Sequence, residues 1–215
     1  MTTFLTEEDL RNEYVAVMGP DLGSLCHDLR KESDWLQDKW SMFQELFCTG
    51  PERLNLLNSV ACNFFYCLHK LLFEDAMLHL CRLTDPAETK IRVGKKVTVR
   101  KNLTVMGLAD AISDPGLKAK ARTEAQRVKK SCEFARKLRN QRLAHTDLEA
   151  FRKGGTGVQV LNKHIVDALK SIRALLATIE QHYGRRPCAS IADPWGAKAL
   201  VWHLERAAEA AKNES

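Results

Sequence analysis

The residues most able to do chemistry lie in the run Arg139-Asn140-Gln141-Arg142-Leu143-Ala144-His145. Cleavage of RNA without a metal needs a group that accepts the 2′-hydroxyl proton, a group that protonates the leaving 5′-oxygen, and a cation for the phosphorane-like transition state. A histidine can give or take a proton near neutral pH, and the arginine fork matches a phosphate. The run therefore contains the residue types for phosphodiester chemistry.

The same run stands where an apolar helix face should continue. Upstream, residues at alternating steps of four and three form that face: Ala121, Ala125, Val128, Cys132 and Ala135. The next two positions in this rhythm are Arg139 and Arg142. Arginine is almost never fully buried without a partner. Either the helix leaves the core at this point, or the arginines line a cleft.

Helical geometry limits how these residues could act together. An ideal helix places Arg139 and His145 roughly 120° apart around its axis and about 9 Å along it, whereas Arg142 shares the face of His145 better. Arg139 and His145 can share a substrate if the helix ends or bends between them, or if a second subunit supplies one of the two. The alternative is structural, with His145 at the negative end of the helix dipole and Arg139 paired with an acid. The candidate acids for such a pair are Glu74, Asp75 and Asp85.

A second group of polar residues, Arg82-Leu83-Thr84-Asp85-Pro86, ends another long apolar stretch. Thr84 and Asp85 can bond to the amides of a turn before the proline. Arg82 can pair with Asp85 or Glu74. These residues either stabilise a helix end or line the site.

The pattern of apolar residues predicts an all-α protein, a four-helix up-and-down bundle with extra helices at both termini. The expected helices cover about residues 7–18, 21–47, 52–83, 102–112, 117–144 and 162–183, with Asn102 capping the fourth and a last helix opening at Asp193-Pro194. Residues 86–102 alternate and predict a small hairpin or an extended arm. The expected organisation is a helical extension (1–20), the bundle (21–185) and a C-terminal helix (186–215). Helix 52–83 is apolar on most sides and is expected to be central to the core.

Aromatic residues are expected in two settings. Trp35, Trp40 and Phe43 have the spacing of core residues rather than of a base-stacking platform. Trp195 and Trp202 in the last helix are expected to be exposed, where they could contact another subunit or dock within the chain.

Composition excludes several classes of protein. The 215 residues are 45% hydrophobic and 28% charged, which is ordinary for a globular domain. There is no stretch of about 18 uncharged apolar residues, and the first residues are acidic rather than those of a signal peptide, so a cytoplasmic protein without a membrane partner is expected. Seven cysteines without a Cys-x-x-Cys pair predict free buried thiols rather than disulfides or zinc ligands. No metal or other cofactor is expected.

Basic charge is concentrated in one segment. Residues 90–142 contain 16 Lys or Arg against 4 Asp or Glu, so this segment is +12 while the remainder of the chain is −6. A phosphate-rich partner and a solvated helix face are both consistent with this charge.

Two motifs resemble those of the HEPN superfamily (higher eukaryotes and prokaryotes nucleotide-binding), in particular its bacterial abortive-infection U-type branch. Arg139-Asn140, four residues and His145 match the superfamily pattern of Arg, a polar residue and a later His. The stretch 80–86, followed by Asn102-Leu103, is similar to an "Arg-Leu-x-Asp … Asn-Leu" stretch of that branch, and Ala144-His145-x-Asp147 closes the long helix. The resemblance covers roughly residues 20 to 185.

The resemblance implies a HEPN-like bundle that forms a homodimer with one composite cleft, and a metal-independent endoribonuclease used in phage defence or a toxin–antitoxin system. It further implies His145 as the acid–base residue, Arg139 as the phosphate-binding cation, and Asn140 as the residue that positions substrate or His145. We add Arg142, Arg136 and Arg82 as candidate contacts to RNA phosphates, with RNA and a possible antitoxin protein as partners. The alternative is a non-catalytic module that binds RNA or protein.

Overall fold

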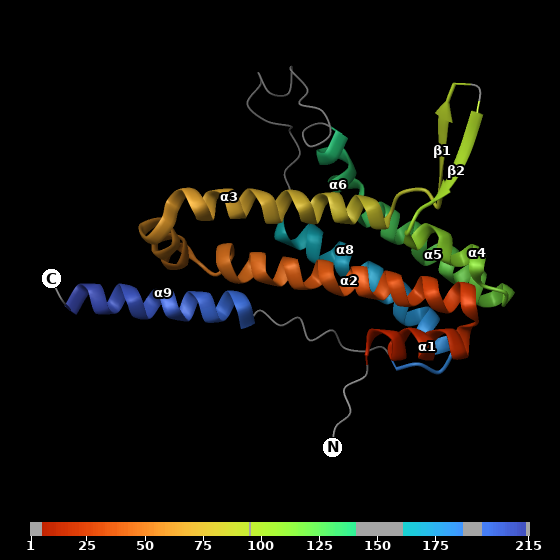
Figure 1. Ribbon diagram of the computed structural model, residues 1–215, viewed down its shortest axis with the longest axis horizontal. Helices are drawn as coiled ribbons and strands as arrows, with labels where there is room; N and C mark the ends of the chain where they lie inside the picture. The colour runs from red at the N-terminus through yellow and green to blue at the C-terminus, as the bar shows by residue number, and fades with distance from the viewer. Residues whose placement is uncertain (1–5, 95, 141–160, 187–194, 214–215) are drawn as a thin grey trace. The chain divides into compact units, whose positions relative to one another are not determined.

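The computed structural model describes residues 6–94, 96–140, 161–186 and 195–213. Most of that part of the chain is helical, and a two-stranded hairpin separates the earlier helices from the later ones (Figure 1). The expected all-α class is therefore confirmed. In chain order the elements are α1 (Glu7–Met18), α2 (Pro20–Phe47), α3 (Pro51–Leu83), β1 (Glu88–Val93), β2 (Lys96–Lys101), the 3₁₀ helix η1 (Val105–Gly107), α4 (Leu108–Ala111), α5 (Pro115–Ser131), α6 (Glu133–Leu138), α8 (Asn162–His182) and α9 (Trp195–Asn213).

The chain divides into two compact units. The first comprises Met1–Ser33 and Leu78–Ala189, and the second comprises Asp34–Met77 and Ser190–Ser215. Helices α2 and α3 each give part of their length to each unit. The first unit contains the hairpin and the motif residues at 139 and 140, and the second contains α9.

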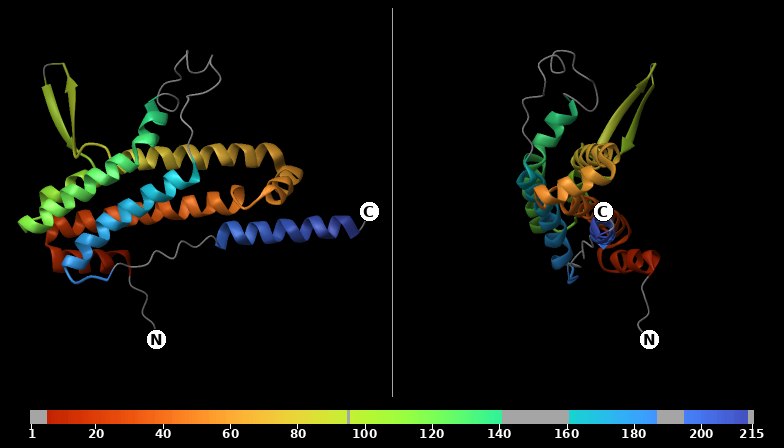
Figure 2. Two further views of the ribbon diagram at one scale, coloured as in Figure 1. Left: turned by 180° about the vertical axis from the view of Figure 1, so that it is seen from behind. Right: turned by 90° about the vertical axis from the view of Figure 1, so that its left-hand side faces the viewer.

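Helices α5 and α8 lie side by side in the first unit (Figure 2). The predicted apolar face of α5 is buried, and α8 buries a row at helical spacing. The α8 row is Ile165, Ala168, Leu169, Ile172, Leu176 and Ile179. Because α5 contributes alanines at 121 and 125, the larger α8 side chains have room against it.

A buried ion pair connects α2 to α8. Glu180, only 1% exposed, accepts hydrogen bonds from Nε of Arg30 at 2.9 Å and from the hydroxyl of Tyr14 at 2.6 Å. Burial, and then the bond to Glu180, raise the pKa of Tyr14, so its hydroxyl remains a donor. Gly23 allows α1 to pack this close to α2, because a Cβ at position 23 would lie 2.6 Å from the carbonyl oxygen of Tyr14. A network of three elements thus depends on one carboxylate.

The basic helix expected from 117 to 144 is interrupted, so that prediction was wrong in its length. α5 ends at Ser131, Cys132 has φ −99° and ψ 3°, and α6 begins at Glu133. The amide of Cys132 contacts the carbonyls of both Val128 and Lys129, a tighter turn than an α-helix makes. Figure 1 shows α6 leaving the line of α5.

The cap of the segment after the hairpin was also predicted wrongly. Thr104 caps η1, since its hydroxyl accepts the amide of Met106 at 3.2 Å. Asn102 closes the base of the hairpin instead, and its amide donates to the carbonyl of Pro86 at 2.8 Å and to Oγ1 of Thr89 at 2.7 Å. The predicted hairpin itself is confirmed.

The core of the second unit is apolar and rich in aromatic rings. Its buried cluster is Leu46, Leu57, Phe65, Ala197 and Val201. Trp40 and Phe43 stack at 4.5 Å and are buried, as predicted. Trp35 is 53% exposed, so its prediction as a core residue was wrong; it lies on another face of α2 than Trp40, with Lys39 over its ring at 5.5 Å. Trp202 is half exposed, as expected, and the side chain of Trp195 lies outside the described residues.

Helix α3 is only partly a core helix, which corrects the expectation that it is central throughout. Ala76, Met77 and Leu80 are buried, but Phe64 is 60% and Leu71 65% exposed. By length and composition α3 is the one described helix that could span a membrane, and 11% of its apolar window is buried. Much of its apolar surface therefore has no cover within the described chain.

The cysteines of the described residues are free, as predicted. Their predicted burial is correct for only half of them. Cys26, Cys81 and Cys132 are buried, whereas Cys48, Cys62 and Cys67 are exposed; Cys188 lies outside the described residues. Burial raises the pKa of Cys26 to about 12.

Replacing Glu180 should destabilise the first unit strongly. We expect Glu180→Ala to lower the free energy of unfolding by about 3 kcal/mol, because the buried Arg30 guanidinium loses its carboxylate. Urea denaturation followed by circular dichroism measures the change. Glu13→Ala is the matched control, since its carboxylate pairs with Arg185 on the surface, and we expect it to cost less than about 1 kcal/mol. Equal losses in the two variants would contradict the role assigned to Glu180.

Candidate functional site

The candidate site is built around the turn that follows α3. The hydroxyl of Thr84 bonds to the carbonyl of Leu80 at 2.8 Å and so stays within the last turn of its helix. From the chain after the hairpin, the hydroxyl of Thr104 lies 2.9 Å from the carbonyl of Leu83 and 2.8 Å from that of Asp85. Thr84 and Thr104 are both buried. These bonds fix the backbone on either side of the Asp85 carboxylate.

Arg136 of α6 clamps this turn. Its Nη1 donates to Oδ1 of Asp85 at 2.8 Å, and its Nη2 donates to the carbonyl and to Oγ1 of Thr84, both at 2.9 Å. A guanidinium held by three such bonds is fixed in one orientation. Arg136 is therefore a structural connection between α6 and the end of α3.

Arg139 reaches the same carboxylate but is held less tightly. Its Nη1 lies 3.3 Å from Oδ1 of Asp85, and its Nε donates to Oδ1 of Asn140 at 3.2 Å. The side chain is 26% exposed. A guanidinium has five N–H donors, so within the described part of the chain three donors of Arg139 have no acceptor. Two arginines on one carboxylate also leave an excess positive charge at this surface.

Two thiols lie beside the arginines but are not activated. Burial raises the pKa of Cys81, and the nearby charges of Arg139 and Arg136 oppose only part of that rise. Burial also raises the pKa of Cys132, to about 12. Both groups are thiols at neutral pH, and a thiol is a much weaker nucleophile than a thiolate. The arrangement favours binding of an anion over nucleophilic catalysis by cysteine.

The structure brings together some of the residues singled out from the sequence. Arg136 and Arg139 meet at Asp85, and Asn140 bonds to Arg139. Arg82, on the last turn of α3, is exposed and makes no ion pair within the described ranges, so the expectation that it pairs with Asp85 or Glu74 was wrong. Asp85 pairs instead with Arg136 of α6 and with Arg139, which directly follows that helix. Arg142 and His145 lie outside the described residues.

The pair between Arg139 and Asp85 was one of the alternatives left open by the sequence, and it is present. The bonds of Arg136 and of Thr104 to the turn around Asp85 were not predicted from the sequence. Arg136 and Arg139 are three residues apart and thus neighbours on a helix, which is the signal that could have pointed to a shared partner. No comparable pattern predicts the bonds of Thr104, because its partners lie about twenty residues earlier in the sequence, before the hairpin.

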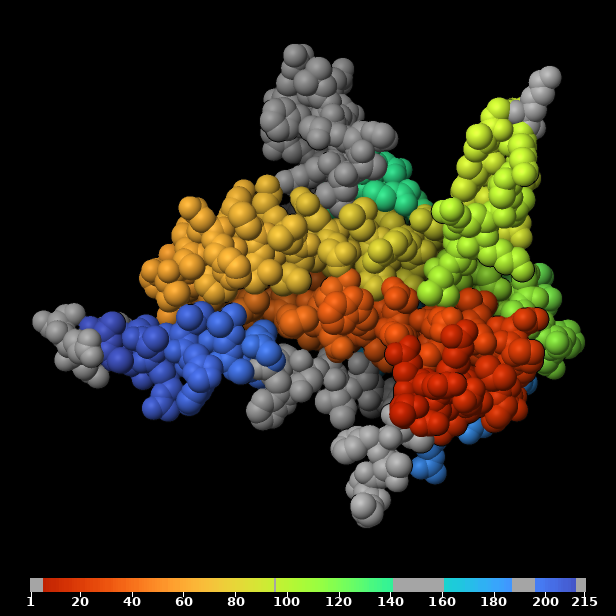
Figure 3. Space-filling model, viewed as in Figure 1, coloured from red at the N-terminus to blue at the C-terminus, as the bar shows by residue number. Residues whose placement is uncertain are grey.

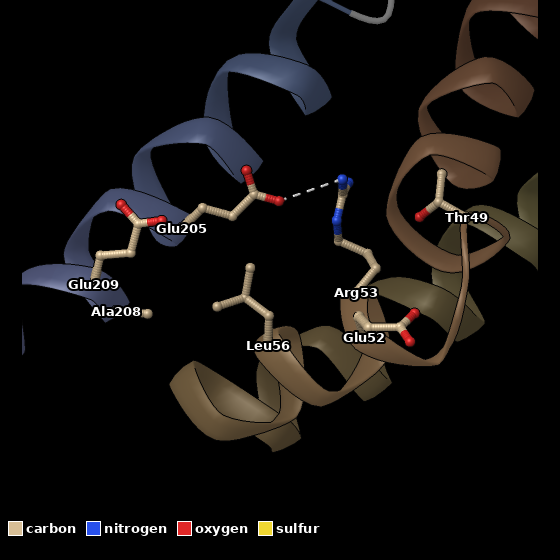
Figure 4. Close-up of a pocket in the computed structure, with 7 residues that line it drawn as sticks. All are labelled: Thr49, Glu52, Arg53, Leu56, Glu205, Ala208 and Glu209. Carbon is tan, nitrogen blue, oxygen red and sulfur yellow. Dashed lines mark ion pairs between the residues drawn. The ribbon is translucent and has the colours of Figure 1, made fainter. Parts of the chain in front are cut away.

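Two surface hollows are lined by residues other than those of this cluster. In the second unit, one of about 350 Å³ is lined by glutamates, and Arg53 pairs across it with Glu205 at 3.6 Å (Figure 4). In the first unit, one of about 540 Å³ between α6 and α8 includes Phe134 and His164. Nδ1 of His164 accepts the amide of Leu161 at 3.3 Å, so this histidine serves its own helix terminus. Over residues 6–94, 96–140, 161–186 and 195–213, no group of three His, Cys, Asp or Glu is arranged to hold a metal.

The all-α fold, with Arg139 and Asn140 next to each other after α6, is consistent with a HEPN-like domain. Comparison with family models supports this: the AbiU2 model of the HEPN domains matches residues 20–199. The chain therefore belongs to the HEPN family AbiU2 and is an abortive-infection HEPN domain. Neither the curated proteins nor the solved structures gave a match.

Removing the Asp85 carboxylate should loosen α6. We expect Asp85→Ala to lower the free energy of unfolding by about 2 kcal/mol, because two guanidinium groups lose a charged acceptor. Asp110→Ala is the control; it removes an exposed carboxylate that also accepts from an arginine, Arg122, at 3.2 Å. It should cost less than about 0.5 kcal/mol. Chemical denaturation of both variants measures the difference, and a cost at Asp85 no larger than at Asp110 would refute the clamp.

Proposed function

We propose that this protein is a metal-independent endoribonuclease of a phage-defence or toxin–antitoxin system and that it acts as a homodimer. In this mechanism His145 moves protons to and from the reacting oxygens, Arg139 holds the scissile phosphate, and Asn140 positions Arg139. The observation that carries the proposal is the Arg139 guanidinium, which Asp85 and Asn140 orient, while its three other donors have no acceptor within the described part of the chain.

The contrast between the two arginines supports this division of roles. Arg136 makes three bonds to Asp85 and Thr84, so we assign it the role of positioning Arg139 rather than the phosphate contact expected from the sequence. Arg139 makes one long bond to the carboxylate, and a phosphate can compete for it. A preorganised cation of this kind stabilises charge that develops in a transition state without the cost of reorientation.

Asp85 also tunes the affinity of the site. Without it, two neighbouring guanidinium groups would repel each other and project in different directions. With it, the pair keeps about one unit of positive charge, enough to attract a phosphodiester, which carries one negative charge. RNA phosphates outside the scissile bond are predicted to contact Arg142 and Arg82, of which Arg82 is exposed.

A surface on α3 supports the proposed homodimer. Apolar residues recur there at steps of three and four, at Phe64, Cys67 and Leu71, all after the kink in α3 at Ala61. They are exposed, with Phe64 and Leu71 at 60% and 65%. A stripe with this spacing is typical of a helix that packs along another helix. A second copy of the chain is the occupant that the proposed shared cleft requires, since it would bring His145 of one chain to Arg139 of the other.

Activity requires both motif residues but no metal. We expect the wild-type protein to cleave RNA in the presence of chelator and to leave 2′,3′-cyclic phosphate ends. His145→Ala should slow cleavage by at least about a hundredfold, and Arg139→Ala by roughly 10²–10³. Gel analysis of end-labelled RNA measures both rates. Arg122→Ala, on an exposed face of α5, should cleave at the wild-type rate.

The outcome of that assay decides between the two functional classes. A folded wild-type dimer that binds RNA and never cuts it would contradict the nuclease and favour the non-catalytic binding module. Cleavage that persists in His145→Ala would exclude the proposed role of the histidine.

The α3 surface should control the oligomeric state. We expect Phe64→Glu/Leu71→Glu to convert a dimer into a monomer, because each charge would be buried in an apolar contact, and to abolish cleavage with it. Light scattering after size exclusion measures the mass. Val17→Glu, at a 46% exposed position on α1, is the control and should remain dimeric. A dimer that survives the α3 change would place the interface elsewhere.

A further inference from the structure

The hairpin of β1 and β2 has no packing partner in the described chain. All six residues of each strand are exposed. The strands are antiparallel, from Glu88 opposite Lys101 to Val93 opposite Lys96, and Gly94 with φ 61° supplies the left-handed residue of the turn. Figure 3 shows the hairpin as a narrow arm that stands off the helices. At about 3.4 Å per residue, each strand carries the arm roughly 20 Å outward.

The arm is strongly basic on both faces. Its strands hold five cationic side chains and a single acidic one, Glu88: the cations are Lys90, Arg92, Lys96, Arg100 and Lys101. Residues that pair across the strands share a face. The register therefore puts Lys90, Arg92 and Lys101 on one face and Lys96 and Arg100 on the other. None of the five pairs with an acid among the described residues.

The composition of the arm indicates which form of nucleic acid it suits. Its two strands contain no aromatic residue, and their remaining side chains are threonines, valines and one isoleucine. Recognition of single-stranded RNA depends largely on bases that stack on aromatic rings. Double-stranded RNA is bound mainly through its phosphates and 2′-hydroxyls, for which cations and small polar groups suffice.

The base of the arm is continuous with the candidate site. Asn102 connects β2 to the carbonyl oxygens of Pro86 and Ala87, at 2.8 and 2.9 Å. Asp85, which orients Arg139, directly precedes Pro86 in the chain. Thr104 bonds to the same turn. An isolated two-stranded hairpin is marginally stable in water. These bonds hold the arm at a fixed starting point beside the phosphate-binding arginine.

We propose that the hairpin is an RNA-binding arm that holds the phosphate backbone of a double-stranded segment next to the Arg139 site. This inference rests on the proposed function, because it names the form of RNA that the nuclease would take. The arm would favour substrates in which a stem adjoins the cleaved, unpaired nucleotides. Its cations would release counterions from the stem, so affinity would depend steeply on salt.

The test is RNA binding by the full chain carrying His145→Ala, so that cleavage does not interfere. Fluorescence anisotropy gives Kd for a stem-loop RNA and for an unpaired RNA of equal length over a range of salt concentrations. The arm variant adds Lys90→Gln, Arg92→Gln, Lys96→Gln and Arg100→Gln. The control neutralises four exposed lysines on α5 and α8: Lys120→Gln, Lys129→Gln, Lys163→Gln and Lys170→Gln.

We expect the arm variant to bind the stem-loop at least tenfold more weakly at moderate salt. The slope of log Kd against log salt should fall by about 3, at roughly 0.7–0.9 for each RNA phosphate that the arm no longer neutralises. Binding of the unpaired RNA should match that of the control. A charge-conserving variant, Lys90→Arg/Lys96→Arg, should bind as the parent does, which separates loss of charge from loss of the hairpin's fold.

Three results would overturn the proposed role of the arm. One is a loss for the stem-loop no greater than in the control, and another is an equal loss for paired and unpaired RNA. The third concerns sedimentation with phosphatidylserine vesicles. If the arm variant binds RNA as the parent does but no longer sediments with vesicles that bind the parent, the arm would be assigned to a membrane surface. Because binding is measured without cleavage, failure of the nuclease assay would leave this result intact.

Discussion

One oxygen atom, Oδ1 of Asp85, accepts hydrogen bonds from two arginines, and the arrangement of the site depends on it. Two guanidinium groups three residues apart on a helix repel each other unless an anion lies between them. The carboxylate supplies that anion from a segment more than fifty residues earlier in the chain. It therefore joins α6 to the end of α3 and at the same time sets where Arg139 points.

The shared carboxylate works because its own backbone is fixed. Thr84 and Thr104 are buried and bond to the carbonyl oxygens around it, and Arg136 closes the turn from a third direction. The consequence is that two similar side chains are held to different extents. Within the described part of the chain, Arg136 makes three bonds to the turn, whereas Arg139 makes one bond to Asp85 and one to Asn140.

Local periodicity predicted much of the fold, because it records which face of a helix is buried. This signal predicted the buried face of α5 from Ala121 to Val128. It also placed Arg139 on that face, where a buried arginine needs an acidic partner, and Asp85 was one of the candidates. It failed where distant segments decide. Cys132 fits the apolar rhythm, yet the helix breaks there, and Asn102 looks like a cap but bonds back to Pro86. Likewise, a pattern shows that α3 is apolar and cannot show which of its faces the rest of the chain covers.

The directions in which basic side chains point depend on the secondary structure of the segment as well as on its composition. In α5, apolar residues such as Ala121 and Val128 occupy the inner face, so its lysines are confined to the outer one. In a strand, alternate residues point to opposite faces, and a hairpin that packs on nothing can present cations in both directions. The part of the segment 90–142 that forms a hairpin can thus surround an anionic chain, whereas the part that forms α5 can only lie against one. The base of the hairpin is bonded to the turn that carries Asp85, so the arm begins next to the carboxylate to which Arg136 and Arg139 bond.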